Sequence, residues 1–183
     1  SAVMVVPEIS LTPQTVERFR QRFGDQVAVL HSGLTQKERF YEWKKIRDEK
    51  VSIAIGARSA IFAPFKNLGI IVIDEEHDTS YKQDSSPRYH ARDSAIIRAQ
   101  KQSAVVLLGS ATPSLESIKN AERGKYHYLS LENRVHNRLL PIVKVINMKE
   151  EMDFKKNFSI FSTPLKRAIF DRIKRGEQIF LFL

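Results

Sequence analysis

Four titratable residues, Asp74, Glu75, Glu76 and His77, follow directly after the aliphatic run of residues 70–73. This run is typical of a central strand that is buried on both faces of a parallel sheet, and ligands of such sheets bind at the carboxyl ends of the strands. Three adjacent carboxylates repel one another, so a nearby cation would stabilise them. Mg²⁺ that carries nucleotide phosphates is the natural candidate, because it takes one or two carboxylates and keeps several waters. The alternative is a solvated acidic turn without chemistry.

Three further predicted strands also end in polar residues. Pro7 and Glu8 follow residues 3–6, residues 56–60 follow residues 51–55, and residues 109–114 follow residues 104–108. Strand and helix patterns alternate along the chain, which is typical of an α/β fold with a parallel sheet wrapped by helices. Because the carboxyl ends of parallel strands meet at one edge, we expect all four polar segments to face one cleft.

Capping residues and periodicity predict the remaining elements. Thr12 and Pro13 begin one helix and Gly24 ends it, while Thr35 and Glu38 form a capping box that begins a second. Trp43 on the second helix is expected in the core. The other predicted helices cover residues 91–100, 114–124 and 162–176. Further strands are predicted at 27–30, 126–129, 143–146 and 178–183, and irregular segments at 78–90, 132–140 and 150–161.

The composition favours one compact domain with a polyanionic partner. The chain has 183 residues and a net charge of +9, a surplus that is most often associated with nucleic acid. The sequence contains 0 cysteines, which excludes disulfides and thiolate metal sites and fits a reducing cytosol. No apolar run is long enough to span a membrane. The alternative is a basic surface without such a partner.

The polar segments together resemble the superfamily 2 DNA helicases, and within them the bacterial primosomal replication-restart helicases. The matching segments are residues 6–14 (VPEISLTPQ, motif Ia), 56–64 (GARSAIFAP, the next DNA-side motif), 74–77 (DEEH, the Walker B box), 109–113 (GSATP, motif III) and 81–93 (an aromatic-rich loop). The resemblance covers nearly the whole chain. It implies a RecA-like parallel sheet wrapped by helices, which is the fold of P-loop NTPase helicases.

The resemblance also implies a role for each matching residue. In the acidic box, Asp74 would hold Mg²⁺, Glu75 would orient and activate the attacking water, and Glu76 and His77 would link the catalytic box to motif III. In motif III, the hydroxyls of two residues would change hydrogen-bond partners as the cleft opens and closes; the coupling residues are Gly109, Ser110, Ala111 and Thr112. Contacts to DNA are expected from Pro7, Glu8, Arg58, Ser59, Tyr81, Lys82, Arg88, Tyr89 and His90.

One element of that fold has no counterpart in this sequence. A phosphate-binding loop requires Gly-x-x-x-x-Gly-Lys-Ser/Thr, and none of the seven glycines begins this pattern. The resemblance implies that the loop would precede Val3, and that a second motor domain with zinc sites would follow Leu183. We therefore expect residues 1–150 to be most of the first motor domain and residues 151–183 to be a linker, a helix and the first strand of the second. Such a fragment would be inactive by itself.

The resemblance further implies the activity and partners of the parent protein. It would be an ATP- and Mg²⁺-dependent 3′-to-5′ helicase that translocates on single-stranded DNA, acts at forks, and meets primosome proteins and single-stranded DNA-binding protein in the cytoplasm, associated with the nucleoid. Two other readings of the residues stay open. One is a non-catalytic basic DNA-binding α/β module, and the other is a metal nuclease that uses Asp74, Glu75 and Asp78. The five histidines are too scattered for a zinc site.

Overall fold

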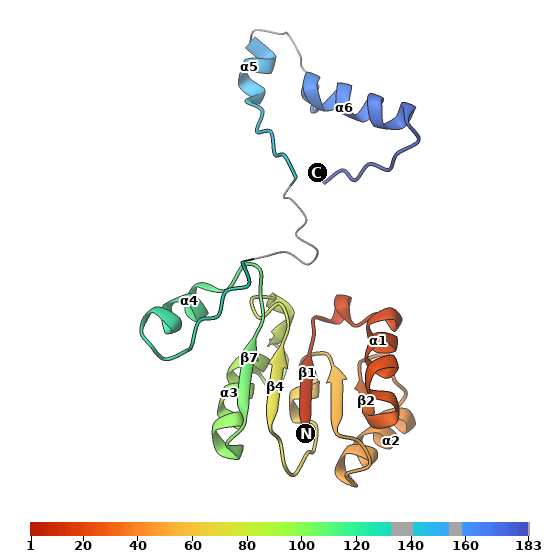
Figure 1. Ribbon diagram of the computed structural model, residues 1–183, viewed down its shortest axis with the longest axis vertical. Coiled ribbons are helices and arrows are strands. Elements are labelled where there is room, and N and C mark those ends of the chain that lie inside the picture. Colours follow the sequence, from red (N-terminus) through yellow and green to blue (C-terminus); the bar gives the residue numbers. More distant parts are fainter. Residues whose placement is uncertain (133–140, 154–158, 183) are drawn as a thin grey trace. The chain divides into compact units, whose positions relative to one another are not determined.

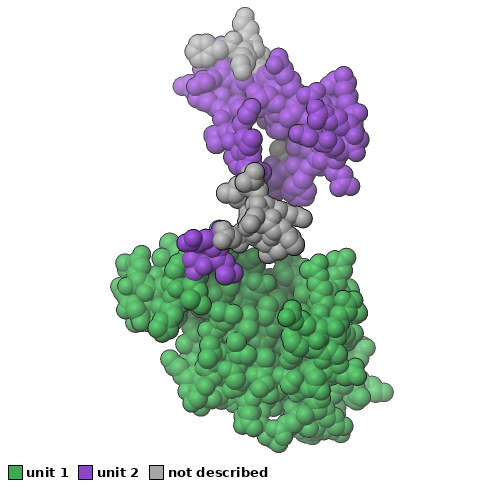
Figure 2. All heavy atoms as spheres, viewed as in Figure 1, with its two compact units in different colours: residues 1–129 green, residues 130–183 purple. Residues whose placement is uncertain are grey.

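The computed structural model describes residues 1–132, 141–153 and 159–182. The chain divides into two compact units, Ser1–Leu129 and Ser130–Leu183, which Figure 2 shows in different colours. The sequence predicts a first domain that continues to residue 150, and the first compact unit ends at Leu129. The assignment of residues 151–183 to the beginning of a second motor domain stays a prediction.

The first unit contains a five-stranded parallel sheet with strand order β2-β3-β1-β4-β7 (Figure 1). Its strands are β1 (Ala2–Val5), β2 (Val27–Leu30), β3 (Ile53–Gly56), β4 (Ile70–Ile73) and β7 (Val105–Leu108). The register pairs the last residues of neighbouring strands with one another. The predicted parallel sheet and its five strands up to residue 108 are thus confirmed, and the polar segments after them begin at one common edge.

Helices connect these strands, as the alternating pattern predicts. They are α1 (Pro13–Phe23), α2 (Gln36–Arg47), α3 (Ala91–Gln102) and α4 (Leu115–Glu122), with 3₁₀-helices η1 (Glu8–Ser10), η2 (Gly24–Gln26), η3 (Arg58–Phe62) and η4 (Thr79–Tyr81). The side chain of Thr12 accepts a hydrogen bond from the Thr15 backbone, and the capping box between Thr35 and Glu38 is present. Helix α3 continues past its predicted end at residue 100 to Gln102. It ends there because the next residue, Ser103, adopts a left-handed conformation.

Side chains of the strands alternate between two faces, and each face has its own core. Val3 and Ile71 belong to a large cluster that includes buried residues of α2, α3 and η3. On the opposite face, Ile55 packs with Val16 and Phe19 of α1. The sheet is therefore sandwiched between helices over β1, β2 and β3, which is the layered arrangement of an α/β domain.

The two strands at the other side of the sheet are covered less completely. In β4, Ile71 is fully buried but Val72 is only half-buried. In β7, Val105 and Leu107 are 63% and 46% exposed. The prediction that β4 is buried on both faces therefore holds for one face only, because α1 packs beside β2 and β3 and does not reach β4.

Gly56 brings the end of β3 unusually close to β2. A Cβ atom at this position would lie 2.1 Å from the carbonyl oxygen of Leu30 and 2.8 Å from the Cβ of Ala60. Only glycine fits such an approach. The next residue, Ala57, donates its backbone N–H to the same Leu30 carbonyl at 3.2 Å. This contact fixes the point where η3 begins and so places Arg58 and Ser59 at the sheet edge.

The segment of residues 78–90 is more ordered than predicted. It contains η4 and an antiparallel pair of two-residue strands, β5 (Lys82–Gln83) and β6 (Tyr89–His90). The side chain of Asp78 caps η4 by accepting a hydrogen bond from the Ser80 backbone at 2.8 Å. Strands of this length leave no periodicity in a sequence, so the prediction of an irregular loop was wrong for a physical reason.

In the second unit, residues 141–153 and 159–182 include the helices α5 (Met148–Asp153) and α6 (Thr163–Lys174). Helix α6 is confirmed, and its predicted cap is present because the Ser162 side chain accepts a hydrogen bond from Leu165. Residues 150–153, predicted as linker, belong to α5, where Asn147 accepts a hydrogen bond from the Lys149 backbone. Residues 133–140 of the predicted irregular segment lie outside the described residues. None of the described helices is long and apolar enough to cross a membrane.

Three predicted strands are absent from the described residues. Residues 126–129, 143–146 and 178–182 have no strand structure, and Leu183 lies outside the described residues. Each of these segments is rich in β-branched or aromatic residues, which favours strands. A strand needs a hydrogen-bonded neighbour, however, and the sheet of the first unit ends at β7.

Candidate functional site

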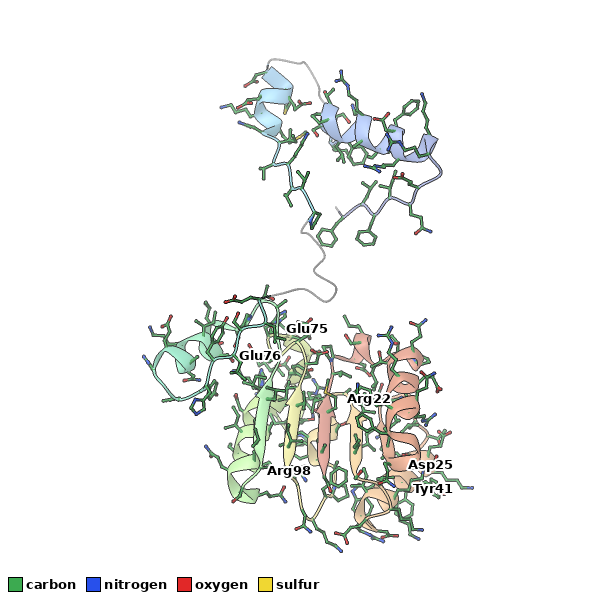
Figure 3. The ribbon with its side chains drawn as sticks, viewed as in Figure 1. Arg22, Asp25, Tyr41, Glu75, Glu76 and Arg98 are labelled. Atoms are coloured by element: carbon green, nitrogen blue, oxygen red, sulfur yellow. The ribbon has the colours of Figure 1, made fainter. Side chains whose placement is uncertain are left out.

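The acidic box begins where β4 ends, and the side chain of its second residue, Glu75, is exposed whereas that of its third, Glu76, is buried. The backbone N–H of Asp74 donates to Val5 at 2.9 Å, and that of Asp78 donates to Glu75 at 2.8 Å, so the box forms a tight turn. Glu75 has φ +46°, a left-handed conformation that is uncommon outside glycine and concentrates at functional sites. The turn leaves the Glu75 side chain 44% exposed. Figure 3 shows Glu75 and Glu76 at the same end of the sheet.

Glu76 is buried, and its carboxylate accepts four hydrogen bonds. The backbone N–H of Ser114 donates at 2.6 Å and its hydroxyl at 3.1 Å, the Ser117 hydroxyl donates at 2.9 Å, and the Arg92 guanidinium donates at 3.1 Å. Only 2% of the Glu76 side chain is exposed. This residue therefore holds the start of α4 against the acidic box, and its contacts support the linking role that the resemblance implied, without access to a substrate.

These partners also set the charge state of Glu76. Burial alone would raise the pKa of the carboxyl group, but the hydrogen bonds from Ser114, Arg92 and Ser117 outweigh it and lower the pKa below its ordinary value of 4.5. The carboxylate is consequently ionised at neutral pH and forms a buried ion pair with Arg92.

His77 and the predicted motif III are in contact. Its Nδ1 atom lies 2.8 Å from the Ser110 hydroxyl and its Nε2 atom lies 3.4 Å from the Thr112 hydroxyl. Gly109 donates its N–H to Ile73 at 2.8 Å, and its carbonyl accepts from Glu76 at 3.0 Å. The predicted proximity of the box and residues 109–112 is thus present, with Ala111 exposed at the surface.

The carboxylates present fit Mg²⁺ held together with phosphates rather than a protein-only metal cage. Among the described residues no group of three or more acidic or histidine side chains could hold a metal ion. Asp74 and Glu75 offer hard oxygen donors, and Mg²⁺ commonly uses one or two carboxylates and completes its shell with water and phosphate oxygens. Asp74 also accepts a hydrogen bond from the Glu75 backbone at 3.1 Å, which orients its carboxylate.

Tyr81 holds the backbone of the acidic box through a hydrogen bond to Asp74. Its ring is fully buried, and its hydroxyl donates to the carbonyls of Asp74 at 2.5 Å and Val5 at 3.3 Å. Burial, with the nearby negative charge of Asp74, raises the pKa of the Tyr81 hydroxyl, so the group stays a donor. The expected DNA contact by Tyr81 is therefore corrected, because a buried ring has no face open to a base. Pro7 is also fully buried and is corrected for the same reason.

The cations predicted to contact DNA have different local partners. The Arg58 guanidinium donates to the carbonyls of Ser80 at 2.9 Å and Lys82 at 2.7 Å, which ties η3 to the segment after the acidic box. The Lys82 ammonium lies 3.5 Å from Asp84 at the surface. Arg88 is exposed and donates to the Asp84 carbonyl at 3.0 Å. Contacts of these three residues with DNA stay a prediction.

Tyr89 and His90 form the short strand β6 and are half-buried. The ring of Tyr89 packs edge-on against Phe62, with ring centroids 5.0 Å apart. Phe62 is 58% exposed, so it presents more aromatic surface to solvent than its neighbour. The Nδ1 atom of His90 is buried and has no hydrogen-bond partner in the part of the chain that the structure describes. Base stacking by Tyr89 stays a prediction. Phe62, which contacts Tyr89, is a second aromatic residue at this place.

Glu8 and Ser59 line one pocket at the edge where β1, β2 and β3 end. The Glu8 carboxylate accepts a hydrogen bond from the Ser32 hydroxyl, which connects the ends of β1 and β2. Sequence reasoning missed several residues of these sites, because tertiary contacts alone reveal them: Arg92, Ser114, Ser117, Ser32 and Phe62. The one local signal was the spacing of Ser114 and Ser117, which puts two hydroxyls on neighbouring positions of a helix start.

Comparisons with known proteins agree with this geometry. A sequence profile described as DEAD/DEAH box helicase matches residues 1–121. Replication restart protein PriA of Bacillus subtilis (strain 168) is 54% identical over 182 residues, which is 100% of this chain and 22% of that protein. The protein of the same name from Haemophilus influenzae is 49% identical over 99% of this chain and 24% of its own length. The chain therefore spans less than a quarter of these two curated relatives.

A solved structure is similar at a lower level. The C-terminal domain of the DEAD-box protein Dbp5 aligns with a TM-score of 0.46 and 16% sequence identity, over 71% of this chain and 72% of that one. The fold is established by the strand order and register of the chain itself.

Proposed function

The chain belongs to the DEAD/DEAH box helicase family, and on that premise we propose that it is part of an ATP-dependent DNA helicase that restarts stalled replication forks. The replication-restart role is supported by relatives named Replication restart protein PriA. In this proposal the longer protein hydrolyses ATP, translocates 3′-to-5′ on single-stranded DNA and takes part in primosome assembly. Its partners are forked and single-stranded DNA, primosome proteins and single-stranded DNA-binding protein, in the cytoplasm at the nucleoid.

The acidic box supplies the hydrolytic residues. Bound Mg²⁺ would neutralise charge on the phosphates of ATP during phosphoryl transfer. Asp74 would hold that ion, and its position is fixed because both its backbone N–H and its carbonyl are held by hydrogen bonds. Glu75 is exposed on a left-handed turn and acts on the attacking water, orienting it and accepting its proton.

The residues behind Glu75 transmit the state of the nucleotide site. His77 contacts the Ser110 hydroxyl through one ring nitrogen and the Thr112 hydroxyl through the other. Each of these hydrogen bonds can break independently when its hydroxyl turns to another partner. Glu76 keeps the base of α4 in place while this happens, because its four hydrogen bonds are buried. The contact between the box and residues 109–112 is the single observation that supports the helicase proposal most strongly, since it joins the two motifs required for coupling.

The first experiment tests DNA binding by this chain. We expect weak binding of single-stranded DNA without sequence preference, because the net charge of +9 attracts phosphates and carries no base code. Fluorescence anisotropy over a range of salt concentrations should give a straight line of log affinity against log salt, with a slope of about −0.7 for each phosphate contacted. An affinity that does not change with salt, or that depends strongly on sequence, contradicts the proposal.

The second experiment tests the catalytic assignment in a full-length protein that carries this chain. Glu75→Gln should abolish DNA-stimulated phosphate release and leave DNA binding unchanged, because the substitution removes the proton acceptor and keeps the shape. Glu116→Gln on α4, whose side chain lies in an exposed first turn, is the matched control. Full hydrolysis by Glu75→Gln would contradict the assignment of Glu75 as the proton acceptor, whereas the absence of hydrolysis in the unchanged protein would favour the alternative of a non-catalytic basic DNA-binding module.

A further inference from the structure

A pocket of about 490 Å³ lies at the sheet edge, at the carboxyl ends of β1, β2 and β3. Its lining comes from several segments, including Glu8 after β1, Ser32 after β2, Ser59 after β3, and Arg39 and Trp43 of α2. Neither Asp74 nor Glu75 lines it, so this pocket is separate from the nucleotide site proposed above. Its volume falls in the range of roughly 300–1,000 Å³ that is typical of ligand sites.

Two aromatic side chains face this pocket. Phe62 is 58% exposed and Trp43 is 36% exposed. The prediction that Trp43 belongs to the core is thereby corrected, because Ile46 fills the core position of α2 instead. Trp43 is held by the guanidinium of Arg47, which lies 5.0 Å from its ring centroid.

The wall that carries Phe62 is rigid. The Arg98 guanidinium donates to the carbonyls of Ile61 and Ala63, on either side of Phe62, with the second bond at 2.7 Å. The ring itself is supported edge-on by Tyr89. An exposed aromatic ring on a fixed backbone loses little conformational entropy on binding, so it is well suited to a planar partner.

The charges around the pocket leave a positive excess. The lining holds the carboxylate of Glu8, which bonds to the neutral Ser32 hydroxyl and keeps its charge, against the guanidinium groups of Arg39 and Arg58. The Arg58 guanidinium bonds only to neutral carbonyls, so it keeps its charge. In the described part of the chain no acidic side chain forms an ion pair with Arg39. Aromatic surface beside unpaired guanidinium groups is the combination that binds unpaired bases and their phosphates.

We propose that this pocket receives one unpaired base of single-stranded DNA, packed against Phe62 beside Trp43, with Arg39 at the adjacent phosphate. The inference rests on the proposed function, because it requires that the chain binds single-stranded DNA. It adds a contact to a base where phosphate contacts alone would hold only the backbone. The pocket would hold any base, since stacking on an aromatic face is sequence-tolerant.

The chain carries its own reporter for this test, because Trp43 is its only tryptophan. Two labelled oligomers of about ten nucleotides are compared, oligodeoxythymidylate and a chain of the same length made of abasic sites. Anisotropy of the label reports binding, and emission of Trp43 reports occupancy of the pocket. We expect both oligomers to bind, and only the one with bases to quench Trp43 emission at saturation.

Variants then locate the base contact. Phe62→Leu should reduce the preference for the base-containing oligomer about tenfold, whereas Phe170→Leu on α6, with a similar exposure of 59% and outside the pocket lining, should leave it unchanged. Arg39→Gln should lower the affinity for both oligomers by the same factor. Arg18 is an exposed arginine of α1 that does not line the pocket, so Arg18→Gln should lower these affinities less.

The outcomes separate this inference from the proposed function. Binding of both oligomers with equal affinity and equal Trp43 emission overturns the base pocket and leaves the DNA-binding proposal standing. A loss of base preference in Phe170→Leu equal to that in Phe62→Leu also overturns it. The absence of any anisotropy change overturns the proposed function, and the base pocket with it.

Discussion

The carboxylate of Glu76 accepts a hydrogen bond of 2.6 Å from the backbone N–H of Ser114, across 38 positions of the sequence. This bond joins the end of the acidic box to the first turn of α4. The bond is buried, and the same carboxylate also accepts hydrogen bonds from the Arg92 guanidinium and from the hydroxyls of two serines. A single ionised side chain therefore fixes the distance between the acidic box and the start of α4, and residues 109–112 lie between these two points.

Replacing Glu76 should destabilise the first unit strongly. In Glu76→Gln the Arg92 guanidinium, whose side chain is 12% exposed, keeps among the described residues only the exposed Asp93 as a charged partner, at 3.3 Å. Loss of the buried partner should then cost up to about 3 kcal/mol of unfolding free energy. Chemical denaturation followed by circular dichroism measures the loss. Glu75→Gln, at an exposed carboxylate, is the control and should change stability by less than about 0.5 kcal/mol.

The same carboxylate makes the stability depend on pH. Because its pKa is lower in the folded chain than the ordinary value of 4.5, the native state binds fewer protons than the unfolded state. Its contribution is complete above pH 4.5 and is lost as the pH falls below that value through the lower native pKa. Denaturation midpoints measured between neutral and acid pH should fall less steeply in Glu76→Gln. Identical slopes in both proteins would contradict this assignment.

This chain by itself should not hydrolyse ATP. Its sequence contains no Gly-x-x-x-x-Gly-Lys-Ser/Thr segment, which supplies the backbone donors and the lysine that bind the phosphates. Phosphate release with and without single-stranded DNA should match a buffer blank. The prediction fails if the chain shows turnover that Glu75→Gln removes, since such turnover would come from this acidic box.

Tyr89→Ala in a full-length protein that carries this chain should separate ATP binding from its stimulation by DNA. The substitution removes the edge contact to Phe62 and loosens the segment after the acidic box that Arg58 ties to η3. Nucleotide affinity should be unchanged, DNA affinity should fall by about one stacking contact, roughly 1–3 kcal/mol, and DNA stimulation of hydrolysis and unwinding should decrease. A mutant with full DNA stimulation would assign these aromatic residues to packing alone.

Deleting residues 178–183 should reduce aggregation and leave the melting temperature nearly unchanged. The described residues of this segment have no strand structure, and Phe180 and Phe182 are 90% and 92% exposed. Exposed apolar residues that form no core contribute little to stability and promote association between chains. Light scattering and thermal unfolding of the shortened chain test both statements. A large drop in melting temperature would show that the segment packs in the core.

The sequence by itself determined the parallel sheet, the order of its elements and the position of the acidic box. Runs such as residues 70–73 and the capping box at Thr35 predict structure because strand burial and helix capping are local properties of a few adjacent residues. The alternation of strands and helices then required that the carboxyl ends, and the polar residues after them, share one edge.

Only the tertiary structure decided what each polar or aromatic residue does at that edge. The local residue pattern does not separate Glu75 from Glu76, to which only the resemblance gave different roles, yet one is exposed on a left-handed turn and the other is buried against Arg92. It likewise treats Tyr81 and Phe62 as equal aromatics, yet the first is sealed beneath the acidic box and the second opens into a pocket. Exposure and hydrogen-bond partners arise from residues that lie far apart in the chain, so a local pattern carries no information about them.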